Sequence, residues 1–538
     1  MKNKKGSRRN RNKSGPVMVD RFTRLPDDIL LNILDRLNTP DAVRTCLLSK
    51  RTVHLRHMLS HCRIYMSSFV PDYGYATLKD TIPMNAAVAD ATDNVLNFRN
   101  QEIPLRQLSI GFYLKYYDCL TIGKAVARAM TTHKLDSAEF IILTEKPPHY
   151  CTIDDRRRNG KQLMTFFGAC TDAFAGLTRL SLRNLMLGET DIPNILTTCK
   201  RLEYLHLSVC QTEDSVLQLQ LEHPRLVELH ISSAGLELVE LNSLPNLKRL
   251  VFSLWVCPQE PLSFGNVPLL SSLSLTNVSM RWQKVIRLSQ FLPNVPSIRD
   301  LHLNFASEKI WVQPECPKLL APVLQNLQVL NLDKLPEGCD IAWTSFFLEA
   351  APSLKEVCIT AWDHWCEIET DKVEREEHGY CDKTNVEWES SAPDGFRHYN
   401  LSKLTIHGFQ PDDNFMGYIR HVMEAAVNLE EISLYDRKVL KCCEDLDPKI
   451  NVAPSRYPKT IEEQELLRKQ ITEGLVMASP HDVIRMDNAV ADATDTVLTF
   501  RTQEIPLRRL SLCFYLKYYD CLAIGKAVAR AMATQKLE

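Results

Sequence analysis

Apolar residues recur along most of the chain in one short rhythm: an apolar residue, two others, an apolar residue, one other and a third apolar residue. The last two apolar positions are one residue apart, so on a strand their side chains face the same way. The rhythm therefore predicts a series of short strands that each bury one face. It occurs at Leu105/Leu108/Ile110, Leu177/Leu180/Leu182, Leu202/Leu205/Leu207, Leu226/Leu229/Ile231, Leu247/Leu250/Phe252, Leu270/Leu273/Leu275, Ile298/Leu301/Leu303, Leu327/Leu330/Leu332, Leu354/Val357/Ile359, Leu401/Leu404/Ile406 and Leu429/Ile432/Leu434.

The spacing of these triplets predicts how the strands are arranged. Between Leu177 and Leu354 the first positions lie 21 to 29 residues apart. This period is typical of leucine-rich repeats, in which each unit adds one short strand and returns through a helix or loop. No unit can bury its leucines alone, but stacked units can. We therefore predict an α/β fold, a curved solenoid with its strands along the concave side, and the pattern indicates no particular ligand.

A helical spacing precedes this rhythm, in residues 21–59. Pro26 and the two acids after it suit a first helical turn, and apolar residues then recur every three or four positions across residues 29–37. Thr39 is predicted to cap a second helix, and a third is expected around Leu55. Three short helices bury little area alone, so we expect a partner to cover part of their apolar surface.

One long segment interrupts the repeats, and a helix follows them. Residues 364–395 are acidic and polar and predict an inserted surface loop. After Leu434 the chain returns to loop and then to a helix, which Thr460 and Glu463 are placed to begin with a capping box.

Composition narrows the class of protein. The chain has 538 residues, 45% of them apolar and 24% charged, with a net charge of -2, which is ordinary for a soluble globular protein. Residues 1–16 hold seven Lys and Arg and no acid, which predicts a disordered tail or, alternatively, a nuclear-import or nucleic-acid-binding tail. Without a signal sequence or an apolar span of about 18 residues, we expect a soluble protein of the nucleus and/or cytoplasm. The 17 irregularly spaced cysteines indicate reduced thiols.

Motifs for bond chemistry are absent from the sequence. It contains no phosphate-binding glycine loop, no G-x-S-x-G elbow and no H-E-x-x-H pair. Two groups of candidate metal ligands, His364/Cys366/His378/Cys381 and His54/His57/His61/Cys62, lack the usual zinc spacings and are expected on solvated surfaces. We therefore predict no enzyme, cofactor or metal, and we expect the scattered tryptophans to pack in the core more often than at a ligand surface.

Two segments resemble domains of known families. LPDDILLNILDRL followed by TPDAVRTCLLSKR resembles the F-box, although Thr52 stands where these domains usually carry tryptophan. LSKLTIHGFQPDDNFMGYIRHVMEAAVNLEEISLY, with RYPKTIEEQELLRKQITEG behind it, resembles the FBD region that follows leucine-rich repeats in many plant F-box proteins. The chain is thus similar to the plant F-box/FBD/leucine-rich-repeat family over most of residues 21–485.

The resemblance implies a substrate-recognition subunit of an SCF-type cullin ubiquitin ligase. Its F-box would bind a Skp-family adaptor, and through it the cullin, while the repeats bind a protein substrate. The positions that match the family's adaptor contacts are Leu25, Pro26, Ile29, Ile33, Leu37, Val43 and Leu47. The alternative is a leucine-rich-repeat protein-binding scaffold with a degenerate F-box that joins no ligase, because Thr52 could weaken adaptor binding.

The chain also contains a long internal duplication. Residues 84–136 match residues 486–538 at roughly four positions in five. The copy either caps the array or binds another chain, or it is the appended start of a duplicated neighbouring unit, and we favour the second interpretation because a first repeat is shaped to receive a successor.

The predicted organisation follows from these features. The domains are a basic tail at 1–19, an F-box at 20–60, a linker and array start at 61–100, leucine-rich repeats at 101–395 with the acidic insert at 364–395, the last repeats and FBD-like region at 396–485, and the partial duplicate at 486–538.

Overall fold

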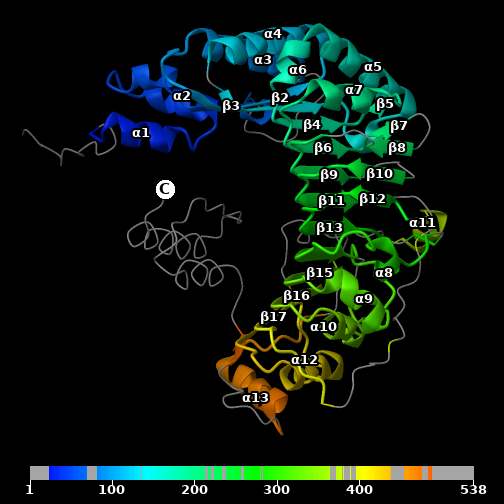
Figure 1. Cartoon of the computed structure of the whole chain (residues 1–538). Coiled ribbons are helices and arrows are strands. Elements are labelled where there is room, and N and C mark those ends of the chain that lie inside the picture. Colours follow the sequence, from blue (N-terminus) through cyan, green and yellow to red (C-terminus); the bar gives the residue numbers. More distant parts are fainter. Residues whose placement is uncertain are drawn as a thin grey trace, which may run out of the picture. The chain divides into compact units, whose positions relative to one another are not determined.

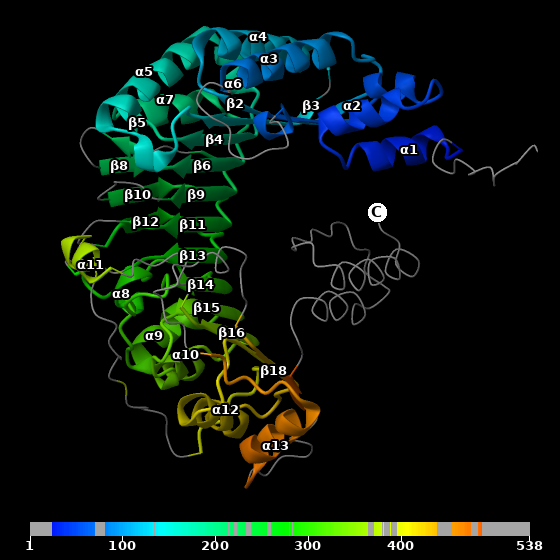
Figure 2. The same ribbon diagram turned by 180° about the vertical axis from the view of Figure 1, so that it is seen from behind.

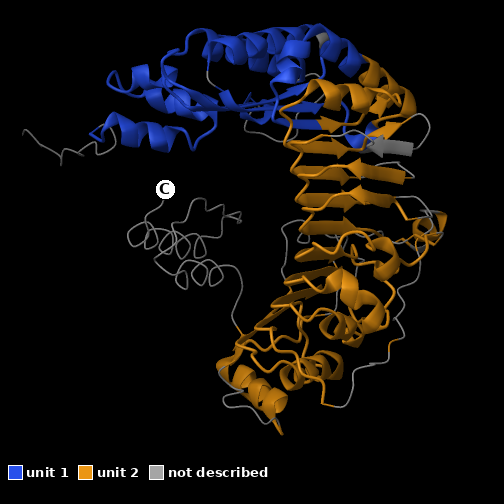
Figure 3. Ribbon diagram, viewed as in Figure 1, with its two compact units in different colours: residues 1–150, 162–181 blue, residues 151–161, 182–538 orange. Residues whose placement is uncertain are grey.

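The computed structural model resolves the chain into two compact units (Figure 3). It describes residues 24–69, 81–133, 135–212, 216–219, 223–232, 238–255, 260–278, 280–281, 283–363, 371–378, 380, 388, 395–437, 454–474 and 483–486. The basic tail at 1–19 and the duplicate copy after Met486 lie outside the described residues. Unit 1 comprises residues 1–150 and 162–181, and unit 2 comprises residues 151–161 and 182–538.

The first helices of unit 1 form a small module with its own core. They are α1 (Asp27–Leu34), α2 (Thr39–Leu47) and the 3-10 helix η1 (Val53–His57). Leu30, Leu34 and Leu55 are buried at their centre. The predicted cap at Thr39 is wrong by one residue: Asn38 caps α2, because its side chain accepts a hydrogen bond from the backbone N–H of Asp41 at 2.9 Å. The third predicted helix is the 3-10 helix η1.

Hydrogen bonds tie this helical module to a strand. Strand β1 (His61–Tyr65) follows the helices, and the 3-10 helix η2 (Met66–Phe69) follows β1. The Asp35 carboxylate at the end of α1 accepts from the backbone N–H groups of Ser60 and His61 at 2.9 and 3.1 Å, and from the Ser60 hydroxyl. Arg63 closes the contact, because its guanidinium donates to the Asp35 carbonyl at 3.0 Å. The helices therefore continue directly into the first strand of a sheet.

In the rest of unit 1, strands β1, β2 and β3 pair in parallel and are covered by helices (Figure 1). Strand β2 lies between β1 and β3, and Ile110 of β2 is in register with Ile64 of β1 and Phe140 of β3. Four buried aromatic rings, Phe112, Phe140, Phe166 and Phe174, pack with centroids 5.2 to 6.2 Å apart. The elements are α3 (Thr81–Asn97), β2 (Leu105–Tyr113), α4 (Tyr116–Thr132), β3 (Leu135–Leu143), η3 (Pro148–Tyr150), α5 (Ile153–Ala169), α6 (Thr171–Ala175) and β4 (Arg179–Arg183), of which α5 and β4 cross the boundary between the units.

Unit 2 is built on a long sheet in which every described pairing is parallel. From β6 onward the strands follow one another in the order β6-β9-β11-β13-β14-β15-β16-β17-β18-β19. They are β6 (Tyr204–Ser208), β9 (Glu228–Ser232), β11 (Arg249–Ser253), β13 (Ser272–Thr276), β14 (Asp300–Asn304), β15 (Val329–Leu335), β16 (Glu356–Ala361), β17 (Lys403–His407), β18 (Glu431–Tyr435) and β19 (Ile484–Met486).

The leucine rhythm correctly predicted these strands from β6 to β18, whereas β19 carries no triplet and was not predicted. The last two apolar positions of each triplet lie on one strand and are buried, and equivalent positions pair between neighbours, as in Leu273, Leu301 and Leu330. The chain therefore has the predicted α/β architecture of a leucine-rich-repeat solenoid, with N-terminal helices before it. Asparagine side chains connect successive repeats. The side-chain amides of Asn326 and Asn428 donate hydrogen bonds of 2.9 and 2.7 Å to backbone carbonyls of the preceding repeat.

Behind the long sheet lies a second layer, which changes its structure along the unit (Figure 2). Near β6 to β13 it consists of short strands in the orders β5-β7 and β12-β10-β8, and farther along it consists mainly of helices. Its strands are β5 (Met186–Leu187), β7 (Gln211–Thr212), β8 (Val216–Leu219), β10 (Leu238–Ser243) and β12 (Leu262–Asn266). Its helices are α7 (Asp191–Thr198), α8 (Leu288–Phe291), α9 (Pro317–Leu324), η4 (Ala342–Thr344), α10 (Ser345–Ala350) and α12 (Asp413–Ala425), and α13 (Ile461–Thr472) packs on α12.

Two expectations for the later segments can now be compared with the structure. The capping box of α13 is present, with Thr460 and Glu463 bonded reciprocally. The acidic insert was expected to be a free surface loop, but its described part is a helix, α11 (Lys372–His378), that is anchored to the repeats. The Arg375 guanidinium donates two hydrogen bonds, of 2.9 and 2.7 Å, to the carboxylate of Glu308, whose side chain is 4% exposed. The acidic composition of the insert gave no indication that the half-buried Arg375 would anchor it.

Candidate functional site

Five large apolar side chains on or beside α1 and α2 are exposed to solvent. Ile29, Ile33 and Leu37 are 45%, 39% and 37% exposed, and Leu47 and Leu48 are 55% and 84% exposed. Monomeric proteins rarely leave so many large apolar side chains of one small module in water without a use. We name the set Ile29, Ile33, Leu37, Leu47 and Leu48 the apolar face.

The helix α1 carries two adjacent apolar stripes, and the structure separates them. Leu30 and Leu34 are at most 1% exposed and fill the core, whereas Ile29 and Ile33 lie one position earlier and point away from it. None of the seven residues predicted for adaptor binding is buried. Pro26, Ile29, Ile33, Leu37 and Leu47 are exposed, and Leu25 and Val43 are half-buried. The sequence analysis missed Leu48, which adjoins the predicted Leu47.

Polar contacts fix the start of α1 beside this face. The Arg51 guanidinium donates to the Leu25 carbonyl at 2.9 Å and to the Asp27 carboxylate at 3.1 Å. The His54 ring lies 3.3 Å from the other Asp27 oxygen. These groups are exposed, so their ion pairs add little stability, but they hold the chain before α1 in place.

Thr52, the departure from the F-box pattern, is part of the core of this module. Its side chain is 1% exposed, and its hydroxyl lies 2.9 Å from the carbonyl of Cys46 and 3.2 Å from that of Ser49. Carbonyls at the end of a helix lack intrahelical partners, so this hydroxyl satisfies a group that α2 would leave open. Thr52 therefore stabilises the junction of α2 and η1 as a buried residue, and it does not belong to the exposed apolar face.

The long sheet of unit 2 presents a second candidate surface. Between its buried apolar residues, each strand of this sheet from β6 to β18 carries three positions on the other face, all half-buried or exposed except the buried Ser433, and we name these positions the strand face. Its middle positions are nearly all polar: His206, His230, Val251, Ser274, His302, Asn331, Cys358, Thr405 and Ser433. The same alternation that buries the leucines therefore produces a continuous surface of hydrogen-bonding groups.

A hollow of about 340 Å³ lies in the middle of the strand face. It spans β11 to β16 and is lined by Arg249, Ser272, Ser274, Asp300, His302, Asn331, Leu332, Asp333, Cys358 and Thr360. Asp300 accepts a hydrogen bond from the Ser272 hydroxyl at 3.1 Å, and Asp333 accepts one from the Asn304 amide at 2.9 Å. The hollow is small and polar, which suits contact with side chains of another protein.

This hollow brings a thiol, an imidazole and a carboxylate together, but their arrangement does not make a nucleophile. The His302 Nε2 atom lies 3.6 Å from the Asp333 carboxylate. Burial opposes ionisation of Asp333, but the contact with His302 outweighs it and lowers the pKa of the carboxyl. Burial, with Asp333 nearby, raises the pKa of the Cys358 thiol to about 11. Because the thiolate is the reactive form, this raised pKa disfavours Cys358 as a nucleophile at neutral pH.

Nearer the start of unit 2 the strand face carries an aromatic and imidazole cluster. The rings of Tyr204 and His206 lie 5.1 and 5.8 Å from the ring of His230, and Glu228 accepts from His230 at 2.7 Å. Burial, followed by the positive potential of His230, lowers the pKa of His206. A neutral His206 can both donate and accept hydrogen bonds.

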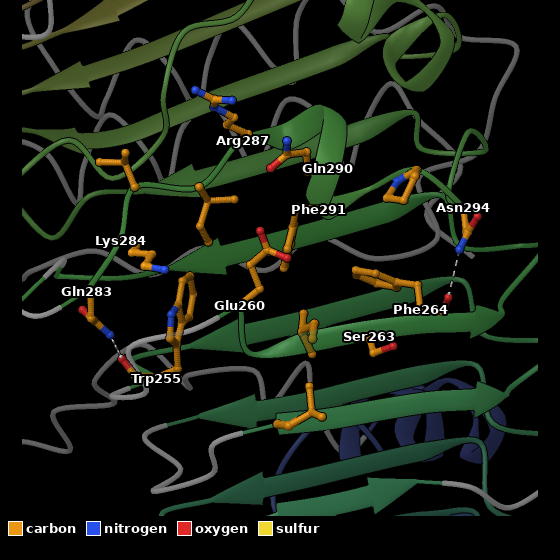
Figure 4. Close-up of a pocket in the computed structure, with 15 residues that line it drawn as sticks. Trp255, Glu260, Ser263, Phe264, Gln283, Lys284, Arg287, Gln290, Phe291 and Asn294 are labelled. Atoms are coloured by element: carbon orange, nitrogen blue, oxygen red, sulfur yellow. Dashed lines mark hydrogen bonds between the residues drawn. The ribbon is translucent and has the colours of Figure 1, made fainter.

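A larger hollow, of about 690 Å³, lies in the second layer of unit 2 (Figure 4). Its lining combines buried rings with polar and charged groups at the rim. It is lined by Leu238, Trp255, Glu260, Leu262, Ser263, Phe264, Gln283, Lys284, Val285, Ile286, Arg287, Gln290, Phe291, Pro293 and Asn294. No motif in the sequence indicated this hollow.

Other candidate sites gain no support. In the described part of the chain, no group of three or more His, Cys, Asp and Glu residues is arranged to hold a metal ion. Of the two candidate ligand groups, His364, Cys366 and Cys381 lie outside the described residues. Trp255, Trp311, Trp343 and Trp362 are buried, as expected for core residues, whereas Trp282 and Trp365 are not described. Among the helices that the structure describes, none has the length and apolar character needed to span a bilayer.

Known protein families match both the N-terminal helical module and the repeats. The family described as "At1g61320/AtMIF1, LRR domain" matches residues 167–472, more than half of the chain, and the F-box domain matches residues 22–55. The chain is similar to the F-box protein At1g80960 of Arabidopsis thaliana, with 25% identity over 233 residues. This alignment covers 40% of the chain and 45% of the relative, so the chain matches less than half of that protein's length.

Proposed function

We propose that the chain is the substrate-recognition subunit of an SCF-type cullin ubiquitin ligase, because it belongs to the leucine-rich-repeat family described as At1g61320/AtMIF1, matches the F-box domain and is similar to a plant F-box protein. In this role the F-box binds a Skp-family adaptor, which links it to the cullin, and the repeats bind a protein substrate. Catalysis lies in other subunits, and the chain acts by holding the substrate's lysines near the transfer machinery.

The observation that carries this proposal is the apolar face of α1 and α2. Ile29, Ile33 and Leu47 are at least 39% exposed although the module has a complete core behind them. Burying a fully exposed side chain of this kind contributes about 1.5–3 kcal/mol and a half-exposed one about half of that, so three of them would supply part of the binding free energy of a partner. A helix-rich adaptor surface is the expected partner, because exposed Leu and Ile at helical spacing fit an apolar groove.

The second part of the proposal concerns the strand face. Its histidines, hydroxyls and carboxylates offer directional contacts but little apolar area. Such a surface distinguishes partners by whether their polar groups are matched, because an unmatched buried polar group costs about 1–3 kcal/mol. We assign substrate binding to the strand face and adaptor binding to the apolar face.

A pull-down tests the adaptor part. Full-length protein with Ile29→Asp and Ile33→Asp should lose a purified Skp-family adaptor, because two charges would enter an apolar interface. Leu466→Asp is the matched control: Leu466 is 59% exposed, but it lies on α13. Equal recovery of adaptor by the double variant and the control would refute the ligase role.

A second double variant extends the test to Leu25, which precedes α1. The double variant Leu25→Asp with Ile29→Asp probes the edge where Leu25 is half-buried. Adaptor loss here as well would place the first turn of α1, with Ile29, in the interface. If only the Ile29→Asp and Ile33→Asp pair failed, the contact would lie farther along α1.

In the alternative role, as a protein-binding scaffold, the chain would also bind its partner through the strand face but would bind no adaptor. This alternative rested on Thr52, and Thr52 is a buried, hydrogen-bonded residue behind the apolar face. This placement favours the ligase subunit over the scaffold. We propose the nucleus and/or cytoplasm as its compartment, which fractionation of tagged full-length protein would test.

A further inference from the structure

The second layer of unit 2 has a gap where two neighbouring repeats diverge. In the long sheet, β11 and β13 pair directly, with Leu250 opposite Leu273. Behind them, the same two repeats contribute β12 and the short extended segment 284–287, which do not pair with each other. The 690 Å³ hollow lies between these two segments (Figure 4).

One wall of the hollow is the open edge of a sheet. In the order β12-β10-β8, strand β12 pairs only with β10. The backbone N–H of Val239 donates to the carbonyl of Pro261 at 2.8 Å, and Val239 lies opposite Leu262. Because backbone groups alternate sides along a strand, those of Leu262 and Phe264 point away from β10. Among the described residues they find one partner, the Asn294 amide at 3.5 Å from the Phe264 carbonyl.

The opposite wall is also an open edge. The N–H of Ile286 donates to the Trp311 carbonyl at 2.8 Å, and the Ile286 carbonyl accepts from Gln313 at 2.9 Å. By the same alternation the backbone groups of Val285 point toward the hollow, and they form no hydrogen bond to any described residue. Two edges with free donors and acceptors therefore border one hollow, which is the arrangement that accepts an added strand.

The side chains of the hollow indicate the chemistry of such a strand. Buried rings of Trp255, Phe264 and Phe291 line the hollow, with Phe264 and Phe291 packed edge to face at 5.7 Å. Two cations, Lys284 and Arg287, stand at the rim against one acid, Glu260. Arg287 is held by a hydrogen bond of 3.1 Å to Gln313.

We propose that this hollow binds an extended peptide segment of a partner protein, which adds a strand between β12 and residues 284–287. Alternate side chains of the segment are apolar and cover the buried rings, and the intervening ones include a carboxylate that meets Lys284 and Arg287. The volume falls within the range of roughly 300–1,000 Å³ of specific binding pockets. The site is separate from both the apolar face and the strand face, so it would add a second recognition point to the proposed receptor.

Selection from a library tests the proposal on the full-length protein. Phage displaying random dodecapeptides would be selected for binding to wild-type protein, after removal of the phage that bind the variant Lys284→Glu. The recovered sequences should alternate apolar residues and carry a carboxylate. Synthetic copies of them should bind Lys284→Glu about fivefold more weakly than wild type. The matched control is Lys318→Glu, an exposed lysine on α9, which should bind the peptides as wild type does.

Backbone methylation separates strand pairing from other binding. N-methylation removes a donor, so methylating the alternate residues whose N–H groups face β12, or the intervening residue beside Val285, should weaken binding about fivefold or more. Methylating residues at the peptide's ends, beyond both edges, should not. Peptides that tolerate methylation everywhere, or recovery of none that distinguishes Lys284→Glu from wild type, would overturn the proposal. Lys284→Glu should keep full adaptor binding, so this result is distinct from failure of the ligase role.

Discussion

The apolar face and the strand face use the same residue types in opposite ways. On α1 and α2 the leucines point outward, and Leu47 is 55% exposed. On the strands the leucines point inward, and Leu303 is fully buried while polar neighbours such as His302 face out. The first surface can bind through area alone, and the second must bind through matched polar contacts.

This difference teaches how one chain can serve a common partner and a particular one. An apolar surface gains affinity from any complementary groove of the right shape, which suits an adaptor shared by many receptors. A polar surface rejects partners that leave its groups unpaired, which suits the choice of one substrate. The strand face also contains hollows and charged pairs that differ from repeat to repeat, whereas the leucines behind it hardly vary.

The largest expected effect comes from replacing a leucine by alanine, either in the core behind the strand face or on the apolar face. Leu303→Ala should lower the free energy of unfolding by about 3–5 kcal/mol, because it leaves a cavity in the core. Leu47→Ala should change it by less than about 0.5 kcal/mol, because that side chain is largely in water already. Denaturation in urea followed by circular dichroism measures both values.

Adaptor affinity should show the reverse order for this pair. Leu47→Ala should weaken adaptor binding about tenfold, and Leu303→Ala should leave it unchanged in protein that is still folded. If Leu47→Ala destabilised the chain as strongly as Leu303→Ala, the face would be covered by the chain itself, and the comparison would fail.

A smaller effect is expected at Thr52, which lies behind the apolar face. Thr52→Val removes a buried hydroxyl and leaves the Cys46 carbonyl without its side-chain donor, which should cost about 1–2 kcal/mol of unfolding free energy. Thr52→Ser keeps the hydroxyl and should cost less. Thermal unfolding of the three proteins measures this order, and a fully stable Thr52→Val would show that the hydroxyl is dispensable.

The sequence predicted the strand face well because one physical rule governs every repeat. Each strand must bury two side chains on one side, so Leu301 and Leu303 or Leu330 and Leu332 are visible as a spacing. Strand β1 was missed, because it has only Cys62 and Ile64 as buried residues and no leucine triplet. The second layer was predicted only as a helix or loop in each repeat, so its short strands were missed, since its segments vary in length and type.

The candidate site was predicted only in part. In α1 the neighbours Ile29 and Leu30 are equally apolar, so the spacing cannot say which of them faces the core. The family resemblance pointed to Ile29 and Ile33, and the packing of Leu30 into the core explains why these two are exposed. Nothing in the sequence signals the hollow beside β12, because it depends on two backbone edges that diverge in space, and backbone edges leave no residue pattern.

The smallest expected effect concerns the junction where the helices that carry the apolar face meet the first strand. Burial opposes ionisation of Asp35, but hydrogen bonds from the side chains of His61 and Ser60 outweigh it and lower the pKa of the carboxyl below its ordinary value. The unfolded chain therefore takes up the proton first. The stability from this contact is complete above the unfolded pKa and is lost as pH falls through the folded pKa.

Asp35→Asn should consequently cost about 1 kcal/mol at neutral pH, and its difference from wild type should shrink below pH of about 4. Ser60→Ala removes one hydrogen bond to the carboxylate and should fall between the two. Urea unfolding at a series of pH values measures these differences. A constant gap between Asp35→Asn and wild type at every pH would mean that the carboxyl's charge plays no part in joining the helices to β1, and that shape alone joins them.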